Sequence, residues 1–395
     1  MLKININKYF IFLLILSPFV AYFINYGILA YGPFLILGFF VVASGLKNIR
    51  FKELNEIILI IPFTLLALFS YFLNPYLGEF FNTHLIVLLI SFPLIIAVGR
   101  INELSFENRL KYLILIIKTF LAYQVFICFG QFLKYKTGFG FDAPLEFQYL
   151  QMIPGSFANS NDLSSVLVLI LYAILTLEKN IEKKEFYSIL FVVLILLVLS
   201  ASRLALVISL IIFCFRNINS IKNIVINLAN LILITSVSLF LVFLFGGGRS
   251  FEKIRTIFDI YNQGFSADNS ASIRLDSYGF FLNNIDKIGM GSFKINDYFI
   301  YSNSTESAYI NDLMFQNPHS LFVEVGYWLG YWGLFFLFLY LCAFFKNHNG
   351  NKLIFMLTFL VVTTISSSIL GSFLFFSFFI IVALFDYSSK MESSG

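Results

Sequence analysis

The chain has 395 residues, of which 59% are hydrophobic and only 12% are charged. Soluble domains carry about 25% charged residues, and the hydrophobic residues here form long blocks instead of periodic stripes, so the composition excludes an ordinary soluble protein. The net charge of +4 is uninformative as a total, and we expect no nucleic-acid partner. Cys128, Cys214 and Cys342 all fall inside apolar runs, so no disulfide framework is predicted.

The apolar runs predict an all-α, polytopic membrane helix bundle, with residues 1–395 forming a single integral membrane domain. A membrane span requires about 20 mainly apolar residues. About twelve transmembrane helices are expected, near residues 9–26, 28–46, 55–73, 82–98, 111–133, 160–177, 186–200, 203–216, 222–245, 320–345, 352–368 and 370–386. The first run follows Lys3 and Lys8 and could pass for a signal peptide, but it continues directly into a second apolar block. It is therefore interpreted as a retained span.

Basic residues gather in alternate connections between the predicted spans. They are Lys3 and Lys8; Lys47, Arg50 and Lys52; Arg100 and Arg109; Lys179, Lys183 and Lys184; Arg216 and Lys222; Lys346 and Lys352; and Lys390. The short connections near residues 26–27, 74–81 and 366–372 carry no Lys or Arg. Because cytoplasmic loops collect Lys and Arg, both termini are predicted to be cytoplasmic.

Two longer connections lie on the predicted outer side, at residues 134–158 and 246–318. The second opens with three glycines and is the largest soluble piece of the chain. Connections in helical bundles usually have two to eight residues, so a loop of this size is expected to be functional. Helical segments are predicted within it at residues 250–260 and 273–285.

The first candidate site residues stand at the start of the sixth span, in Gly155-Ser156-Phe157-Ala158-Asn159-Ser160-Asn161-Asp162. Asn159 or Asn161 can cap the helix by accepting its first backbone N–H groups. Alternatively, a polar helix N-terminus exposed on the outer side can hold an anion or sugar hydroxyls. Both interpretations remain open from the sequence.

Arginines supply the second and third candidates. Arg203 follows Ser202 between two apolar runs, where a charge at membrane depth costs about 2.5–3.5 kcal/mol and usually has a function. It could instead reach the outer interface or bond helix-end carbonyls. Arg249, Arg255 and Arg274 lie in the long loop, and the planar guanidinium matches phosphate oxygens. A solvated pair with Asp is the simpler interpretation for Arg249 and Arg255.

The fourth candidate is Asn317-Pro318-His319-Ser320, with Glu324 after it, at the start of the tenth span. Pro318 suits the first turn of a helix. The positive end of the helix dipole would favour the neutral imidazole of His319, which could then accept a proton, although a lone His is more often structural. The sequence contains no Asp-x-Asp pair, no P-loop and no His/Cys metal cluster, so neither a metal nor another cofactor is predicted.

In this order, the candidates resemble the O-antigen polymerase and ligase superfamily of membrane glycosyltransferases, across a family-like catalytic region at residues 150–345. The matching stretches are Gly-x-Phe-x-Asn-x-Asn at Gly155–Asn161, Ser202-Arg203, Arg274 followed by Gly289-Met290-Gly291, and Pro318-His319 followed by Glu324, Gly326, Gly330 and Gly333. Leu204 and Ser320 depart from the residues, Gly and Asn, that the family often has there.

The resemblance implies a metal-independent glycosyl transfer on the periplasmic face of the bacterial inner (cytoplasmic) membrane. The donor would be a glycan on undecaprenyl diphosphate, and the acceptor a sugar hydroxyl. Arg203 and Arg274 would bind the diphosphate and His319 would activate the acceptor, with Asn159, Asn161, Arg249, Arg255 and Glu324 contacting substrate. No carboxylate pair is arranged for a covalent intermediate, so direct displacement with inversion is expected.

The predicted function is therefore a polymerase that extends O-antigen or a capsule-type polysaccharide from lipid-linked repeat units, with a chain-length regulator as a possible partner alongside membrane lipids. An O-antigen ligase, which transfers finished glycan to lipid A-core, is the alternative, since only the acceptor differs. A flippase or transporter for the lipid-linked unit is less favoured. Transporters place charges at the midplane, and here only Lys118 looks buried within a span.

Overall fold

The computed structural model is helical over the residues that it describes. These are residues 65, 106–143, 153–157, 159–200, 202–215, 225, 229, 232, 236, 274–275, 278–279, 281–287, 320–347, 358 and 362–365. The longer helices are α5 (Phe106–Thr137), α7 (Ser160–Thr176), α8 (Lys183–Ser200), α9 (Arg203–Phe215) and α15 (Leu321–Asn347), with short 3₁₀ turns at Glu178–Asn180 and Ile285–Lys287. No strand occurs among the described residues, which confirms the all-α prediction for this part of the chain.

Each of these five helices coincides with a predicted span. The apolar runs at 111–133, 160–177, 186–200, 203–216 and 320–345 correspond to α5, α7, α8, α9 and α15. Apart from isolated positions, the other predicted spans lie outside the described residues, so the total of about twelve stays a prediction. The described part of the loop at 246–318 contains helical residues between 274 and 287, which overlap the helix expected at 273–285.

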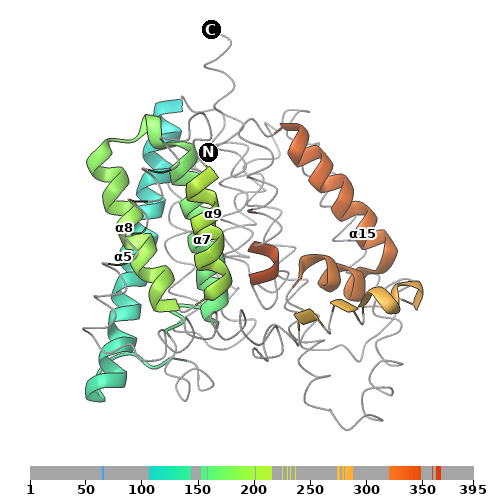
Figure 1. Ribbon diagram of the computed structural model, residues 1–395, viewed down its shortest axis with the longest axis horizontal. Coiled ribbons are helices and arrows are strands. Elements are labelled where there is room, and N and C mark those ends of the chain that lie inside the picture. The colour runs from blue at the N-terminus through green and yellow to red at the C-terminus, as the bar shows by residue number, and fades with distance from the viewer. Residues whose placement is uncertain are drawn as a thin grey trace, which may run out of the picture.

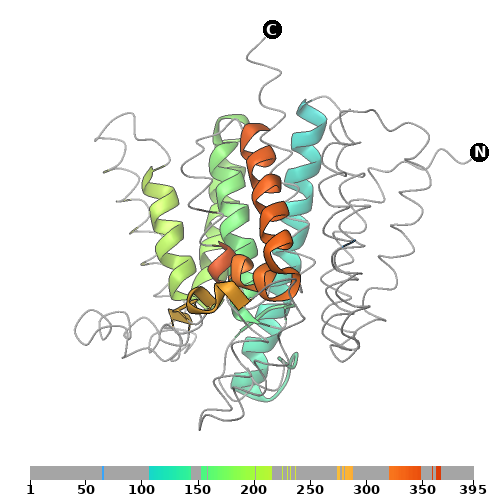
Figure 2. The ribbon, with the colours of Figure 1, turned by 90° about the vertical axis from the view of Figure 1, so that its right-hand side faces the viewer.

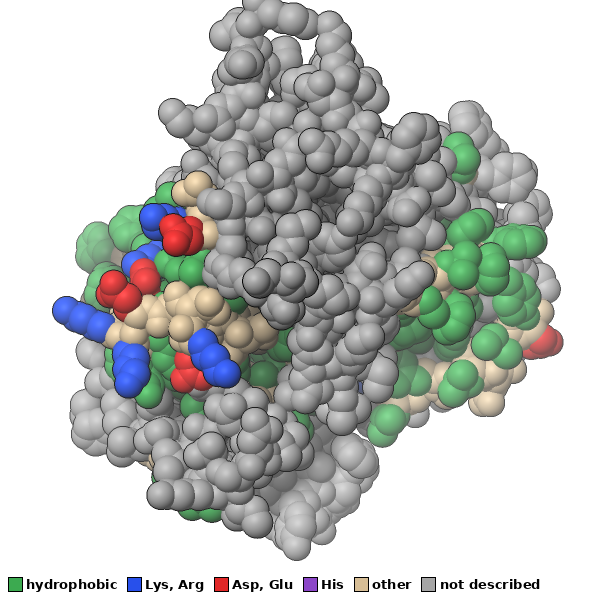
Figure 3. Space-filling view, turned by 90° about the horizontal axis from the view of Figure 1, so that it is seen from above, with side chains coloured by type: hydrophobic (Ala, Val, Ile, Leu, Met, Phe, Trp, Pro, Cys, Tyr) green, Lys and Arg blue, Asp and Glu red, His purple; other side chains and the backbone are tan. Residues whose placement is uncertain are grey.

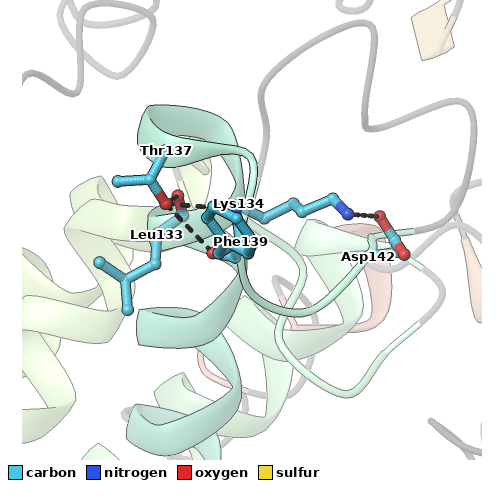
Figure 4. Close-up of polar contacts among 5 residues, drawn as sticks. All are labelled: Leu133, Lys134, Thr137, Phe139 and Asp142. Carbon is cyan, nitrogen blue, oxygen red and sulfur yellow. Dashed lines mark hydrogen bonds and ion pairs between the residues drawn. The ribbon is translucent and has the colours of Figure 1, made fainter.

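Helix α5 is the one described helix that is both long and apolar enough to cross a membrane, over Leu113–Thr137. Its 32 residues extend about 48 Å at 1.5 Å per residue, beyond the roughly 30 Å of a bilayer core. The helix ends where Gly138, at φ +79°, donates its N–H to the Lys134 carbonyl over 2.9 Å. The chain then folds back, and Lys134 pairs with Asp142 at 3.3 Å (Figure 4).

Helix α7 lies at the centre of the described bundle. It packs against both α8 and α9, and residues 163–175 are all buried. An apolar sequence all round a helix is what burial on every side requires. Helix α5 packs on α8, and the green and teal helices stand side by side in both views (Figures 1 and 2).

An ion pair joins α5 to the first turn of α8, between Lys118 and Glu185. The Lys118 side chain is 52% exposed. Lys118 lies within the apolar stretch Leu113–Thr137, as expected, but its side chain is not buried among the described helices. The Lys118 amine reaches the Glu185 carboxylate at the start of α8. At that end of the molecule the exposed side chains of Lys179, Lys183 and Lys184 gather around the α7–α8 connection (Figure 3).

Helix α15, which covers the span predicted near residues 320–345, is bent. The bend falls at Gly330, whose φ of 64° and ψ of −157° are not helical. Only glycine adopts this region readily, because a Cβ would clash with the backbone. The bend separates a short first part, residues 321–329, from the longer part that follows, and the two run in different directions in Figure 1.

Candidate active site

The described candidate residues lie on elements whose ends meet on one side of the molecule. Helices α7, α9 and α15 all begin there, α8 ends there, and the segment 274–287 lies beside the start of α15 (Figures 1 and 2). The α7–α8 connection, whose sequence contains Lys179, lies at the opposite end (Figure 1). Chain segments more than 100 residues apart therefore contribute to one region.

Two glutamines of α5 hold the turn that precedes α7. Gln131 donates from Nε2 to the Gly155 carbonyl at 2.8 Å and accepts the Gly155 N–H at 3.0 Å. Gln124 accepts the Ser156 N–H at 3.0 Å and donates to the Ser156 hydroxyl at 2.6 Å. Gly155 has a φ of +65°, and a Cβ there would lie 2.4 Å from Oε1 of Gln124. Glycine is thus required at this position both by conformation and by space.

Asn159 caps α7, as one of the two sequence interpretations predicted. It has an extended backbone, and its side-chain oxygen accepts the N–H of Asn161 at 2.9 Å. The Asn161 side chain is partly exposed in the first turn. The cap occupies a backbone donor that an anion would otherwise use, so a substrate role for this turn rests on the side chains of Asn161 and its neighbours more than on the helix N-terminus.

The α8–α9 connection lies against the start of α7. Ser164 of α7 donates to the Ser200 hydroxyl at 2.7 Å, and Ser200 donates to the Leu197 carbonyl at 2.7 Å. Ser202 is buried, and Arg203 is the first residue of α9. These contacts place the backbone of Arg203 near the first turns of α7. The Arg203 side chain lies outside the described residues.

The segment that carries Arg274 is docked on α15. Phe281 and Val323 are both buried and form a small core, with Tyr278 and Leu334 packed against it. The Phe281 ring lies 2.5 Å from where a Cβ of Gly326 would stand. Glycine at position 326 is therefore what allows the segment to approach the helix.

Arg274 itself lies one helical turn before Tyr278, and its Nε atom is buried. Burial raises the pKa of the Tyr278 phenol above its ordinary value, and the positive charge of Arg274 lowers it by a smaller amount. The two side chains are thus close enough to interact electrostatically. Further along, the Tyr331 hydroxyl donates to the Ile285 carbonyl, which fixes the far end of the segment beyond the bend of α15.

Glu324 is in the first turn of α15 and is 1% exposed. Its N–H donates to the Ser320 carbonyl at 2.9 Å, and Ser320 is also buried. A negatively charged carboxylate is stabilised near the positive, N-terminal end of a helix. Glu324 is therefore held by the same part of α15 that carries the Arg274 segment.

The remaining predicted site residues, Arg249, Arg255 and His319, lie outside the described residues. His319 immediately precedes Ser320 in the sequence. No group of three or more His, Cys, Asp or Glu side chains that could hold a metal occurs in the described part of the chain.

Sequence reasoning missed Gln124, Gln131 and Tyr278. The two glutamines did leave a signal, since both interrupt an apolar run and they are seven residues apart, which returns to the same helix face after two turns. A polar pair on one face of a predicted span indicates a buried partner, but the partner could not be named. Tyr278 left no signal beyond its distance of four residues from Arg274.

Comparison with known protein families identifies one similar family. The family model described as O-Antigen ligase matches residues 186–338. The match places residues 186–338 in the O-antigen ligase superfamily. The match contains α9, the Arg274 segment and the first two-thirds of α15, and it begins within the first turn of α8. Comparison with curated proteins and with solved structures found no match.

Members of the O-antigen ligase superfamily are membrane proteins and glycosyltransferase-like enzymes of O-antigen and lipopolysaccharide biosynthesis. The resemblance predicted from the sequence is thereby confirmed at the level of the family. The turn at Gly155 and the cap of α7 lie upstream of the matched residues, although they reach the same region of the structure.

Proposed function

We propose that this member of the superfamily is an O-antigen or capsule-type polysaccharide polymerase. It would join undecaprenyl-diphosphate-linked repeat units at the periplasmic face of the bacterial inner membrane, with its termini in the cytoplasm. The observation that carries the proposal is the docking of the Arg274 segment on α15, beside buried Glu324 and at the end where α7 and α9 begin. The proposal is supported because Arg274, Glu324 and the first turns of α7 and α9 belong to elements that meet at one end of the described bundle.

The chemistry follows from the charge that develops in glycosyl transfer. The bond between the anomeric carbon and the diphosphate oxygen breaks, and its electron pair leaves with the undecaprenyl diphosphate. A sugar hydroxyl of the acceptor unit forms the new glycosidic bond, with inversion. Arg274 and Arg203 would stabilise the leaving diphosphate, and His319 would take the hydroxyl proton. Asn161, Glu324, Arg249 and Arg255 would orient the sugars, and no metal is required by this scheme.

The ligase is the second candidate, because the matching family model is described as O-Antigen ligase. In that case the same donor would be transferred to lipid A-core instead of to a second lipid-linked unit. A transporter is disfavoured further by Lys118, since it is paired with Glu185 at the start of α8 and is not a buried midplane charge of the kind that ion-coupled transporters use.

The proposal is tested with purified protein in lipid nanodiscs and synthetic lipid-linked repeat units. The wild type should make lipid-linked oligomers, in the presence of a chelator as in its absence. Arg274→Lys keeps the charge but loses the two-pronged contact, so the rate should fall by about 10²–10³-fold. Arg109→Lys, in the first turn of α5, is the matched control and should be as active as the wild type.

Two results would count against this account. Normal polymerisation by Arg274→Lys would remove the proposed diphosphate contact. Loss of wild-type activity in chelator, restored by a divalent ion, would show that the reaction needs a metal.

A further inference from the structure

The face of α5 that carries Gln124 and Gln131 is unusual for a helix long and apolar enough to span a membrane. Both side chains are 0% exposed, and seven residues on a helix bring them to the same side. Phe120 lies one turn before Gln124 on this face, and its ring meets that of Phe157 edge-on with centroids 6.3 Å apart. All three side chains of α5 thus contact residues 155–157.

Four hydrogen bonds of 2.6–3.0 Å join these glutamines to one turn of the chain. Three of them involve backbone groups of Gly155 and Ser156, and Gln131 engages both the N–H and the carbonyl of Gly155. A primary amide has both a donor and an acceptor, so it can pair with a peptide unit as a neighbouring strand would. The turn is closed by the Phe157 N–H, which donates to the Pro154 carbonyl at 3.3 Å.

The turn leads directly into Asn159, the cap of α7, and Asn161 in its first turn. Its conformation therefore sets where these two side chains lie at the end of the bundle. Burying two amides contributes little net stability, because each hydrogen bond replaces one made to water. A buried network whose hydrogen bonds are all made instead holds the chain in one specific conformation. Here it fixes the conformation of the turn that leads to the candidate site.

We infer that Gln124 and Gln131 are positioning residues of the enzyme: they fix the Gly155–Phe157 turn and, through it and the Asn159 cap, the placement of Asn161 against the sugar substrate. The inference rests on the proposed function, because that function gives the Asn161 side chain its substrate. The glutamines touch no reacting atom and act only through the turn.

The test compares two substitutions of Gln131 in the purified polymerisation assay. Gln131→Met keeps the length of the side chain and removes both bonds to Gly155. It should lower kcat/KM by about 10²-fold, the loss that a displacement of about 1 Å can cause, while the protein is extracted in a folded, monodisperse form. The carboxyl group in Gln131→Glu has both a donor and an acceptor, as the amide does, only when it is protonated and neutral. The activity of this variant relative to the wild type should rise as the pH is lowered, and that of Gln131→Met should not.

Controls separate positioning from general loss of structure. Ser209→Ala also deletes a buried hydrogen bond, the 2.7 Å bond from Ser209 to the Ala205 carbonyl within α9, and should leave kcat/KM unchanged. Lys134, one turn beyond Gln131, and its partner Asp142 are unchanged in every variant, so they affect all of the pH profiles alike.

A wild-type kcat/KM in Gln131→Met overturns the inference, as do parallel pH profiles of the Met and Glu variants. Arg274→Lys is measured in the same series. If it is inactive while Gln131→Met is fully active, the positioning role fails and the proposed function stands. If both are fully active, the proposed function fails as well.

Discussion

Gly155 combines two constraints that can be separated by experiment. Its φ of +65° costs a residue with a Cβ about 1–2 kcal/mol, and the added carbon would meet Oε1 of Gln124 at 2.4 Å. Gly138 has a similar φ of +79° but nothing within 4 Å of the added carbon. Gly155→Ala should therefore lower the unfolding temperature of the detergent-solubilised protein clearly more than Gly138→Ala does. Equal shifts in the two variants would show that the contact with Gln124 is unimportant.

For single residues, the sequence predicted contacts between positions close together in the chain and missed contacts between positions far apart. The capping role of Asn159 could be predicted because the donor and acceptor are two residues apart and Asn is a preferred cap. The pairing of Gln124 with Ser156 could not, since 32 residues separate them and nothing in the apolar run identifies the partner. Arg274 was correctly placed in a helical stretch, but its neighbour Tyr278 was overlooked.

The element that positions Arg274 depends on the absence of a side chain at Gly326. A methyl group there would meet the Phe281 ring at 2.5 Å, and because Phe281 is buried the ring has little room to move. Gly326→Ala should therefore displace the segment from α15 and lower polymerisation by about 10²-fold. The added substitution Phe281→Leu makes room and should restore part of the activity, as measured by oligomer formation in nanodiscs.

Gly279→Ala is the matched control, because it lies in the same segment and its added carbon has nothing within 4 Å. It should behave as the wild type. An active Gly326→Ala variant, or a double variant no better than the single one, would contradict the view that this contact holds Arg274 in place.

The helices themselves were predictable where they are long and apolar, and α7 and α9 begin at the residues that the sequence suggested. The bend of α15 was not predicted. An apolar run records which residues are buried but not their backbone angles, and Gly330 resembles any other glycine in a span. The positive φ of Gly330 is known only from the structure.

For the molecule as a whole, the alternation of basic connections predicts which end faces the cytoplasm. The segment 274–287, which contains Asn284, and the start of α8, which is Lys183, lie at opposite ends of the structure (Figure 1). Single cysteines at these positions should react differently with a membrane-impermeant thiol reagent in intact spheroplasts. Asn284→Cys should be labelled from outside and Lys183→Cys only after lysis. Labelling of both from one side would contradict the topology and the location of the site.

The arrangement of the helix ends on the two sides of the bundle could be predicted only in part. Charge bias gives the side of the membrane for each connection, so the sequence placed all candidates on one face. It could not show which helix ends are neighbours on that face, because packing between spans depends on side-chain shape across long separations. For example, no sequence pattern indicates the hydrogen bond between Ser164 and Ser200.

The central claim is that the chain joins lipid-linked repeat units. It is tested most directly by the surface lipopolysaccharide of a deletion strain that is complemented with the wild type or with His319→Ala. Loss of a positioned proton acceptor costs about 10²–10⁴-fold in rate, so the variant should behave like the deletion. A polymerase defect predicts lipid A-core that carries a single repeat unit on a gel, because a separate ligase still acts. Bare core, with long glycan accumulating on undecaprenyl diphosphate, would contradict the claim and identify the protein as the ligase.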